Sequence, residues 1–250
     1  MPISLLARSR AEVNASLWRL TPIASVLGVN EPRQRGADRE LGASTWSRKL
    51  LELGYHHEVS EPASKQLFSY AEYVERERAA AIKHEWIAGE IFAMTGGTPE
   101  HARLQATLAR VLGNALLDGP CEVYSSDLRV RSRTTEMATY ADLTVVCGEL
   151  DTDPDDVNAV TNPTLLVEVL SPSTEAYDRG QKAAHYRQIP SLREYVLVAQ
   201  DAPRIEVFRR GHDGHWSFLE AGRGESLVLE SVGCTLAVDE VFGRTDTITA

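Results

Sequence analysis

Glu168 stands in the middle of an otherwise apolar run, Leu165-Leu166-Val167-Glu168-Val169-Leu170, and few folds can accommodate such an arrangement. A short run of Leu and Val predicts a buried β-strand. An isolated carboxylate inside such a strand costs on the order of several kcal/mol. A metal ion, a cationic side chain or protonation must therefore compensate the charge of Glu168.

Asp142 repeats this pattern within Tyr140-Ala141-Asp142-Leu143-Thr144-Val145-Val146. Side chains alternate between the two faces of a strand, so each acid shares its face with uncharged neighbours. If the two strands are adjacent, the carboxylates lie side by side and repel, and a divalent cation resolves that repulsion. Mg²⁺ suits such a site, because it takes one or two carboxylates and keeps water and phosphate oxygens as its other ligands. The alternative is that either acid forms a buried ion pair with an arginine.

Lys182 belongs to a helix that we expect to follow the Glu168 strand, over residues 175–188. The helix could bring this lysine back toward the carboxylates, where its charge would orient a water or stabilise a phosphorane. Two simpler interpretations stay open. Lys182 could be a solvated helix residue, and Asp178 four residues earlier could form an ordinary i,i+4 pair with it.

The order of the expected elements indicates an α/β sandwich, in which a sheet of strands that are apolar on both faces is covered on each side. These elements are a helix over 69–80, a hairpin over 84–94 that turns at Ala88-Gly89, a helix from Thr98-Pro99 that Gly119-Pro120 ends, strands over 121–124, 127–133, 139–147 and 164–170, the helix over 175–188, and strands over 193–199, 204–209, 216–220 and 226–229. An acidic loop is expected over 148–163.

The composition changes near residue 66. Residues 1–66 hold nine Lys/Arg and seven Asp/Glu, whereas residues 67–250 hold 17 and 29. The first segment has weak periodicity, so we expect a poorly ordered or loosely helical extension over 1–66 and one folded domain over 67–250. The net charge of −10 is opposite to the basic balance of most nucleic-acid binders, although a metal site itself requires clustered carboxylates.

Three cysteines, Cys121, Cys147 and Cys234, are widely spaced and form no C-x-x-C pair. Their odd number and the apolar surroundings of the first two predict buried free thiols and no zinc site. The sequence has no apolar run of transmembrane length and no recognisable secretory signal, so a cytoplasmic location without membrane contact is expected.

Several further polar residues are candidates for a site. His101 could act as a base or contact a phosphate, or lie at the surface near a helix start. Asp127 and Glu90 could extend the acidic group, although a turn-forming role suits Asp127 equally. Arg129 and Arg131 share one strand face and could line a track for phosphates, although a solvated face is the commoner situation.

The chain resembles the Uma2 (DUF820) family of the PD-(D/E)XK nuclease superfamily from about Leu67 to Glu240. The most specific part of the resemblance is the stretch Glu168-Val-Leu-Ser-Pro-Ser-Thr174. The other parts are the segments 140–146, 177–182 with Tyr186, and 192–195.

The resemblance implies a restriction-endonuclease-like α/β core with a mixed central sheet flanked by helices in αβββαβ order, an N-terminal helix and hairpin, and a C-terminal β extension. It also implies an endonuclease that cuts DNA with Mg²⁺, for which Mn²⁺ could substitute, and a homodimer. Asp142 and Glu168 would be the metal ligands.

Two positions depart from the family pattern. Ala141 replaces the motif proline, which has no polar side chain to lose. Leu170 replaces the lysine expected two residues after the acid, so Lys182 would have to supply that charge from the helix. The alternative is a catalytically silent nuclease fold that binds nucleic acid or a protein partner, and RNA is open as the substrate of an active enzyme.

Overall fold

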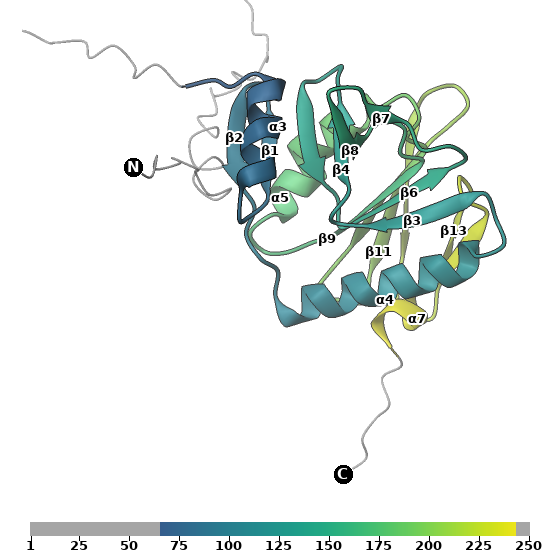
Figure 1. The fold of residues 1–250 in the computed structure, drawn as a ribbon. Helices are drawn as coiled ribbons and strands as arrows, with labels where there is room; N and C mark the ends of the chain where they lie inside the picture. Colours follow the sequence, from purple (N-terminus) through teal and green to yellow (C-terminus); the bar gives the residue numbers. More distant parts are fainter. Residues whose placement is uncertain (1–65, 244–250) are drawn as a thin grey trace, which may run out of the picture. The chain divides into compact units, whose positions relative to one another are not determined.

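The computed structural model describes residues 66–243, and the expected extension over 1–66 lies outside the described residues except for Gln66 (Figure 1). The helices are α3 (Tyr70–Ala79), α4 (Pro99–Leu116), α5 (Glu175–Tyr177), the π-helix η1 (Asp178–Lys182), α6 (Ala183–Tyr186) and α7 (Val238–Phe242). No helix in this part of the chain has the length and apolar character needed to cross a membrane.

The strands form two six-stranded sheets and one hairpin. Sheet A has the order β2 (Glu90–Ala93), β1 (His84–Ile87), β5 (Met137–Tyr140), β4 (Arg129–Ser132), β8 (Asp156–Val160) and β7 (Thr152–Asp153). Sheet B has the order β12 (Trp216–Ala221), β11 (Ile205–Arg210), β10 (Glu194–Val198), β9 (Leu165–Val169), β6 (Leu143–Cys147) and β3 (Cys121–Ser125). The hairpin pairs β13 (Ser226–Leu229) with β14 (Cys234–Ala237).

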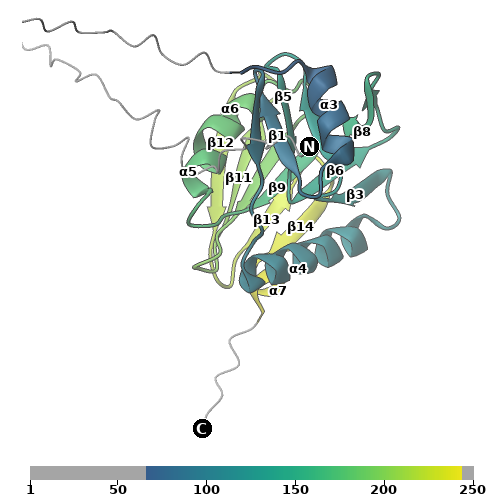
Figure 2. The same cartoon turned by 60° about the vertical axis from the view of Figure 1, so that its left-hand side comes forward.

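Sheet B carries the core and is covered on both faces, as expected for strands that are apolar throughout. Helix α4 lies along one face, and α7 and the β13–β14 hairpin pack beside it (Figures 1 and 2). Residues from the α5–α6 segment and from sheet A pack on the opposite face. Helix α3 packs against β1 of sheet A. The mixed α/β class predicted from the sequence is therefore confirmed.

Short-range signals predicted the local structure well. Ser69 and Glu72 form the expected capping box at the start of α3, and Thr98 caps α4 with Pro99 as its first residue. The β1–β2 hairpin turns at Ala88 and Gly89, both of which have positive φ, as a two-residue hairpin loop requires.

Between β2 and β9 the chain passes five times from one sheet to the other, which the sequence did not reveal. The expected strand over 139–147 is divided into β5 in sheet A and β6 in sheet B, and the break falls at Ala141-Asp142. The expected strands over 121–124 and 127–133 likewise lie in different sheets. The expected loop over 148–163 contains β7 and β8, which extend sheet A beside β4.

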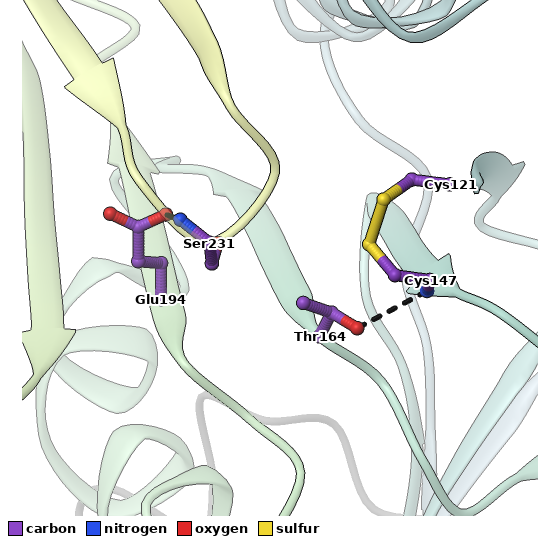
Figure 3. The surroundings of a disulfide bond; sticks show 5 residues. All are labelled: Cys121, Cys147, Thr164, Glu194 and Ser231. Carbon is purple, nitrogen blue, oxygen red and sulfur yellow. Dashed lines mark hydrogen bonds between the residues drawn. A yellow bond between two sulfur atoms is a disulfide. The ribbon is translucent and has the colours of Figure 1, made fainter. Parts of the chain in front are cut away.

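A disulfide joins Cys121 to Cys147, so the prediction of free thiols is wrong for these two residues (Figure 3). The two cysteines are directly opposite each other in the β3–β6 ladder, with Cα atoms 3.9 Å apart. The backbone N–H of Cys147 also donates a hydrogen bond to Thr164 Oγ1 (3.2 Å), just before β9. Cys234 is a buried free thiol, as predicted.

Candidate active site

Asp142 and Glu168 come together at the end of β9. Strands β6 and β9 are antiparallel neighbours, and Leu143 lies opposite Val167. One position further along the same register, Asp142 falls opposite Glu168, at the point where the chain crosses between the sheets. Neither acid is paired with an arginine in the described part of the chain, but Glu168 forms a buried ion pair with Lys182, which compensates part of its charge.

The carboxylate of Asp142 is held by two donors. The backbone N–H of Val169 donates to Asp142 Oδ2 at 2.7 Å, and His101 Nε2 lies 3.1 Å from the same oxygen. The backbone carbonyl of Asp142 accepts a hydrogen bond from Gln105 Nε2 at 3.0 Å. The contact with Asp142 raises the pKa of the His101 imidazole above its ordinary value.

The carboxyl group of Glu168 is only 4% exposed. Lys182 Nζ lies 2.5 Å from Glu168 Oε1, and the Tyr186 hydroxyl donates to the same oxygen at 2.9 Å. Burial raises the pKa of Glu168 to about 8. The nearby charges of Asp178 and Asp142 raise it too, against the lowering effect of Lys182. Glu168 is thus an acid whose ionised form depends on a nearby positive charge.

A π-helical turn presents Lys182 to this carboxyl group. The wider turn of η1 lies between α5 and α6, and π turns of this kind are frequent at functional sites. Asp178, Lys182 and Tyr186 recur every four residues and are all buried. Lys182 Nζ lies 3.6 Å from Asp178 Oδ1, and the lysine is only 1% exposed. The idea of a solvated lysine is therefore wrong, and the i,i+4 pair exists within a larger group.

Glu85 is a member of this group that the sequence analysis missed. It lies on β1, is buried, and places Oε1 3.7 Å from Lys182 Nζ. The hydroxyl of Thr139 on β5 donates a hydrogen bond to it. The signal was present in the sequence, because Glu85 stands between His84 and Trp86 in an apolar hairpin. Sheet A thus contributes a carboxylate to a site whose other members come from β9, from η1 and from the junction between β5 and β6.

We refer to Glu85, Asp142, Glu168 and Asp178 as the acidic cluster. Its oxygen donors suit a hard divalent cation, and Lys182 already lies beside Glu168 as a positive charge. Across residues 66–243, no three acidic, histidine or cysteine side chains form a preformed metal cage. A cation there would have one or two protein carboxylates and otherwise water ligands, as is usual for Mg²⁺. Asp142 and Glu168 fit that requirement.

Arg129 and Arg131 do not form an exposed face, and this expectation is corrected. Both are buried in sheet A. Arg129 is paired with Asp156 and also donates to the Tyr140 hydroxyl. Arg131 donates to the backbone carbonyl of Met137 and lies over aromatic rings. Their partners Asp153 and Asp156 come from the segment expected to be a loop, so the burial of these arginines was hidden in the sequence.

Two other candidates lie outside the acidic cluster. The side chain of Asp127 is 84% exposed and forms a surface pair with Lys83. Glu90 lies beside the hairpin turn, opposite Ile87, and so shares the face of the β1–β2 hairpin that carries Glu85. Among the secondary candidates, the structure brings His101 and Asp178 to the site and places Asp127 at the surface.

Comparisons with known proteins show the family and the fold of this chain. The Uma2 family model, described as "Putative restriction endonuclease", matches residues 70–239, which include every residue of the acidic cluster. Two proteins of Synechocystis sp. are similar over most of their length. "Uncharacterized protein slr1290" is 38% identical over 186 residues, covering 74% of this chain and 96% of its own. "Uncharacterized protein sll1609" is 36% identical over 168 residues, covering 67% and 94%.

A solved structure from Anabaena variabilis has the same fold. It is described as a putative nuclease belonging to DUF820 and superposes with a TM-score of 0.56 at 15% identity. The match covers 68% of this chain and 95% of that one. At this identity the likeness concerns the fold, and the chemistry must be argued from the residues of this chain.

Proposed function

Since this chain belongs to the Uma2 family, whose description and structural neighbour indicate a nuclease, we propose that it is a metal-dependent endonuclease that hydrolyses phosphodiester bonds in DNA. The observation that carries the proposal is that Asp142, just before β6, lies opposite Glu168 on the neighbouring strand β9, with the Lys182 ammonium 2.5 Å from Glu168. Two acids and one cation at one place supply the parts that phosphoryl transfer requires.

Asp142 and Glu168 would hold Mg²⁺ or Mn²⁺. A bound ion of this kind would lower the pKa of a coordinated water and stabilise negative charge on the phosphate. Asp142 is positioned for this by the Val169 N–H, and Glu168 by the Tyr186 hydroxyl. The burial of Glu168 excludes water from part of the site, which strengthens each electrostatic interaction inside it.

Lys182 would supply the positive charge of the motif lysine, because Leu170 stands at the position of that lysine. Its ammonium contacts an oxygen of Glu168 from the helix. It therefore lies beside the same acid as a motif lysine at position 170 would. From there it can orient the attacking water or stabilise charge on the pentavalent phosphorus. The proximity of Lys182 to Glu168 supports an active enzyme over a catalytically silent one.

We expect the purified protein to nick supercoiled plasmid DNA in Mg²⁺ or Mn²⁺ and to be inactive with a chelator. Asp142→Asn and Glu168→Gln should each lower the rate by more than about 100-fold, because even the outer-shell partners of metal ligands are worth roughly 10- to 100-fold. Gel assays of nicking, with circular dichroism to confirm folding, measure this.

Asp127→Asn is the matched control, since it removes one exposed carboxylate outside the acidic cluster. It should leave the rate unchanged. Wild-type rates in folded Asp142→Asn and Glu168→Gln would refute the proposed site. Cleavage of single-stranded RNA but not DNA would change the substrate, and nucleic-acid binding without cleavage would favour the silent alternative.

A further inference from the structure

His101 contacts the acidic cluster from outside it, at the start of α4. Thr98 caps this helix by accepting a hydrogen bond from the backbone N–H of His101 at 3.1 Å. The Thr98 hydroxyl in turn donates to Gln200, whose side chain donates to the backbone carbonyl of Leu170 at 3.3 Å. The helix start is thus tied to the end of β9, where Asp142 and Glu168 meet.

The imidazole reaches the oxygen of Asp142 that already has another donor. His101 Nε2 and the Val169 N–H both contact Oδ2, at 3.1 Å and 2.7 Å. A carboxylate accepts only, so Nε2 carries the proton of this hydrogen bond. Two donors on one oxygen set the orientation of the carboxylate and direct Oδ1 away from them. Both the His101 imidazole and the Val169 N–H contact Oδ2 of Asp142 and not its Oδ1.

Gly97 packs against the imidazole ring of His101. A Cβ atom at this position would lie 2.7 Å from His101 Nδ1 and 2.8 Å from Cγ, which no real side chain tolerates without movement. The backbone of Gly97 therefore packs directly against the ring. At Gly96 a Cβ atom would meet nothing within 4 Å. Neither glycine has a positive φ, so alanine is compatible with the backbone at both positions.

From this geometry we infer that His101 is a positioning residue of the site, which fixes the carboxylate of Asp142 so that Oδ1 faces the bound cation. The inference rests on the proposed function in one respect, namely that Asp142 is a metal ligand. Hydrogen-bonded partners of ligating carboxylates orient them and typically contribute 10- to 100-fold to metal affinity. Gly97 contributes to this positioning, because a residue with a Cβ atom at position 97 would displace the imidazole ring.

Mn²⁺ affinity of the protein without nucleic acid, measured by calorimetry, tests this inference. His101→Leu removes the donor and should weaken Mn²⁺ binding by roughly 10- to 100-fold. His101→Gln carries an N–H at a similar distance from the backbone and should stay within about threefold of wild type. Rescue by glutamine separates positioning from proton transfer, since a side-chain amide does not titrate.

Gly97→Ala and Gly96→Ala form a second, independent pair. Gly97→Ala should displace the ring and weaken Mn²⁺ binding in the direction of His101→Leu, although His101 itself is unchanged. Gly96→Ala adds the same methyl group one residue earlier and should bind Mn²⁺ like the wild type. Thermal melts of all four variants confirm that each is folded.

Wild-type Mn²⁺ affinity in His101→Leu or Gly97→Ala would overturn the inference, and so would a His101→Gln that binds as weakly as His101→Leu. A wild-type protein that binds no Mn²⁺ would overturn it together with the metal site. If the wild type binds Mn²⁺, loses it in the expected variants, and yet cleaves neither DNA nor RNA, the positioning role stands and the proposed function fails.

Discussion

At the scale of single residues, Lys182 explains how three buried carboxylates can lie close together. Its ammonium lies within 4 Å of Glu85, Glu168 and Asp178, and it is almost fully buried. Without a positive charge, carboxylates gathered in an apolar setting repel one another and lose hydration. Lys182 therefore has a structural role in the protein without metal, in addition to the role we propose in cleavage.

Lys182→Met should destabilise the metal-free protein by about 3–5 kcal/mol, the usual cost of removing one partner of a buried ion pair. Mn²⁺ should then raise the melting temperature more in the variant than in the wild type, because the cation replaces the lost charge. Thermal melts with Mn²⁺ and with chelator measure both effects. Lys83→Met, which removes a surface partner of Asp127, should change neither. Equal Mn²⁺ shifts in wild type and Lys182→Met would contradict this role.

At the scale of elements, the π turn η1 decides which side chains reach the acidic cluster. The turn holds Asp178 and Lys182, and Tyr186 follows four residues later in α6, so the three side chains lie on one face. Gly180 lies in this turn, and a Cβ atom there would meet nothing within 4 Å. The turn therefore does not depend on glycine for space.

Gly180→Ala should stabilise the protein by about 0.5–1 kcal/mol, because alanine loses less conformational freedom than glycine in a helix. Urea unfolding measures the change. Cleavage should be unaffected, since the methyl group points into open space. Gly113→Ala in the regular helix α4 offers a matched comparison, because it also has no neighbour within 4 Å. A destabilised Gly180→Ala beside a stabilised Gly113→Ala would show that the π turn requires a glycine backbone.

At the scale of the whole molecule, the chain leaves sheet B after β3, builds β4 and β5 in sheet A, and returns to sheet B at Asp142. The Cys121–Cys147 disulfide joins β3 to β6 and so links the two ends of this segment covalently. A disulfide persists only under oxidising conditions, so the bond describes the oxidised protein. Its contribution is to stability, because the ladder between β3 and β6 already places the two strands.

Reduction of the oxidised protein should lower its free energy of unfolding by about 3–4 kcal/mol, the chain-entropy value for a loop of 26 residues. Urea unfolding with and without a thiol reductant measures this. Cys121→Ala/Cys147→Ala should be insensitive to the reductant. Thiol titration of the unfolded, unreduced chain should count one free thiol, Cys234, and a count of three would contradict the disulfide.

Asp142 was expected in a strand too, but it lies partly exposed at the break between β5 and β6, whereas the sequence by itself determined that Glu168 is a buried acid in a strand and requires positive charge. This follows from local properties, because the cost of burying a carboxylate is set by its immediate apolar neighbours. The caps of α3 and α4 and the turn at Ala88-Gly89 were predictable for the same reason, since each depends on only a few adjacent residues.

Only the tertiary structure decided which other charges join or leave the site. Glu85, His101 and Lys182 come from a hairpin and two helices separated by many residues, and no spacing in the sequence records their distances. Arg129 and Arg131 were expected on a solvated face, yet acids on β7 and β8 neutralise them inside sheet A. A charged side chain can be buried only where another segment supplies its partner. Which segment lies beside it is determined by the tertiary structure and not by the neighbouring residues in the sequence.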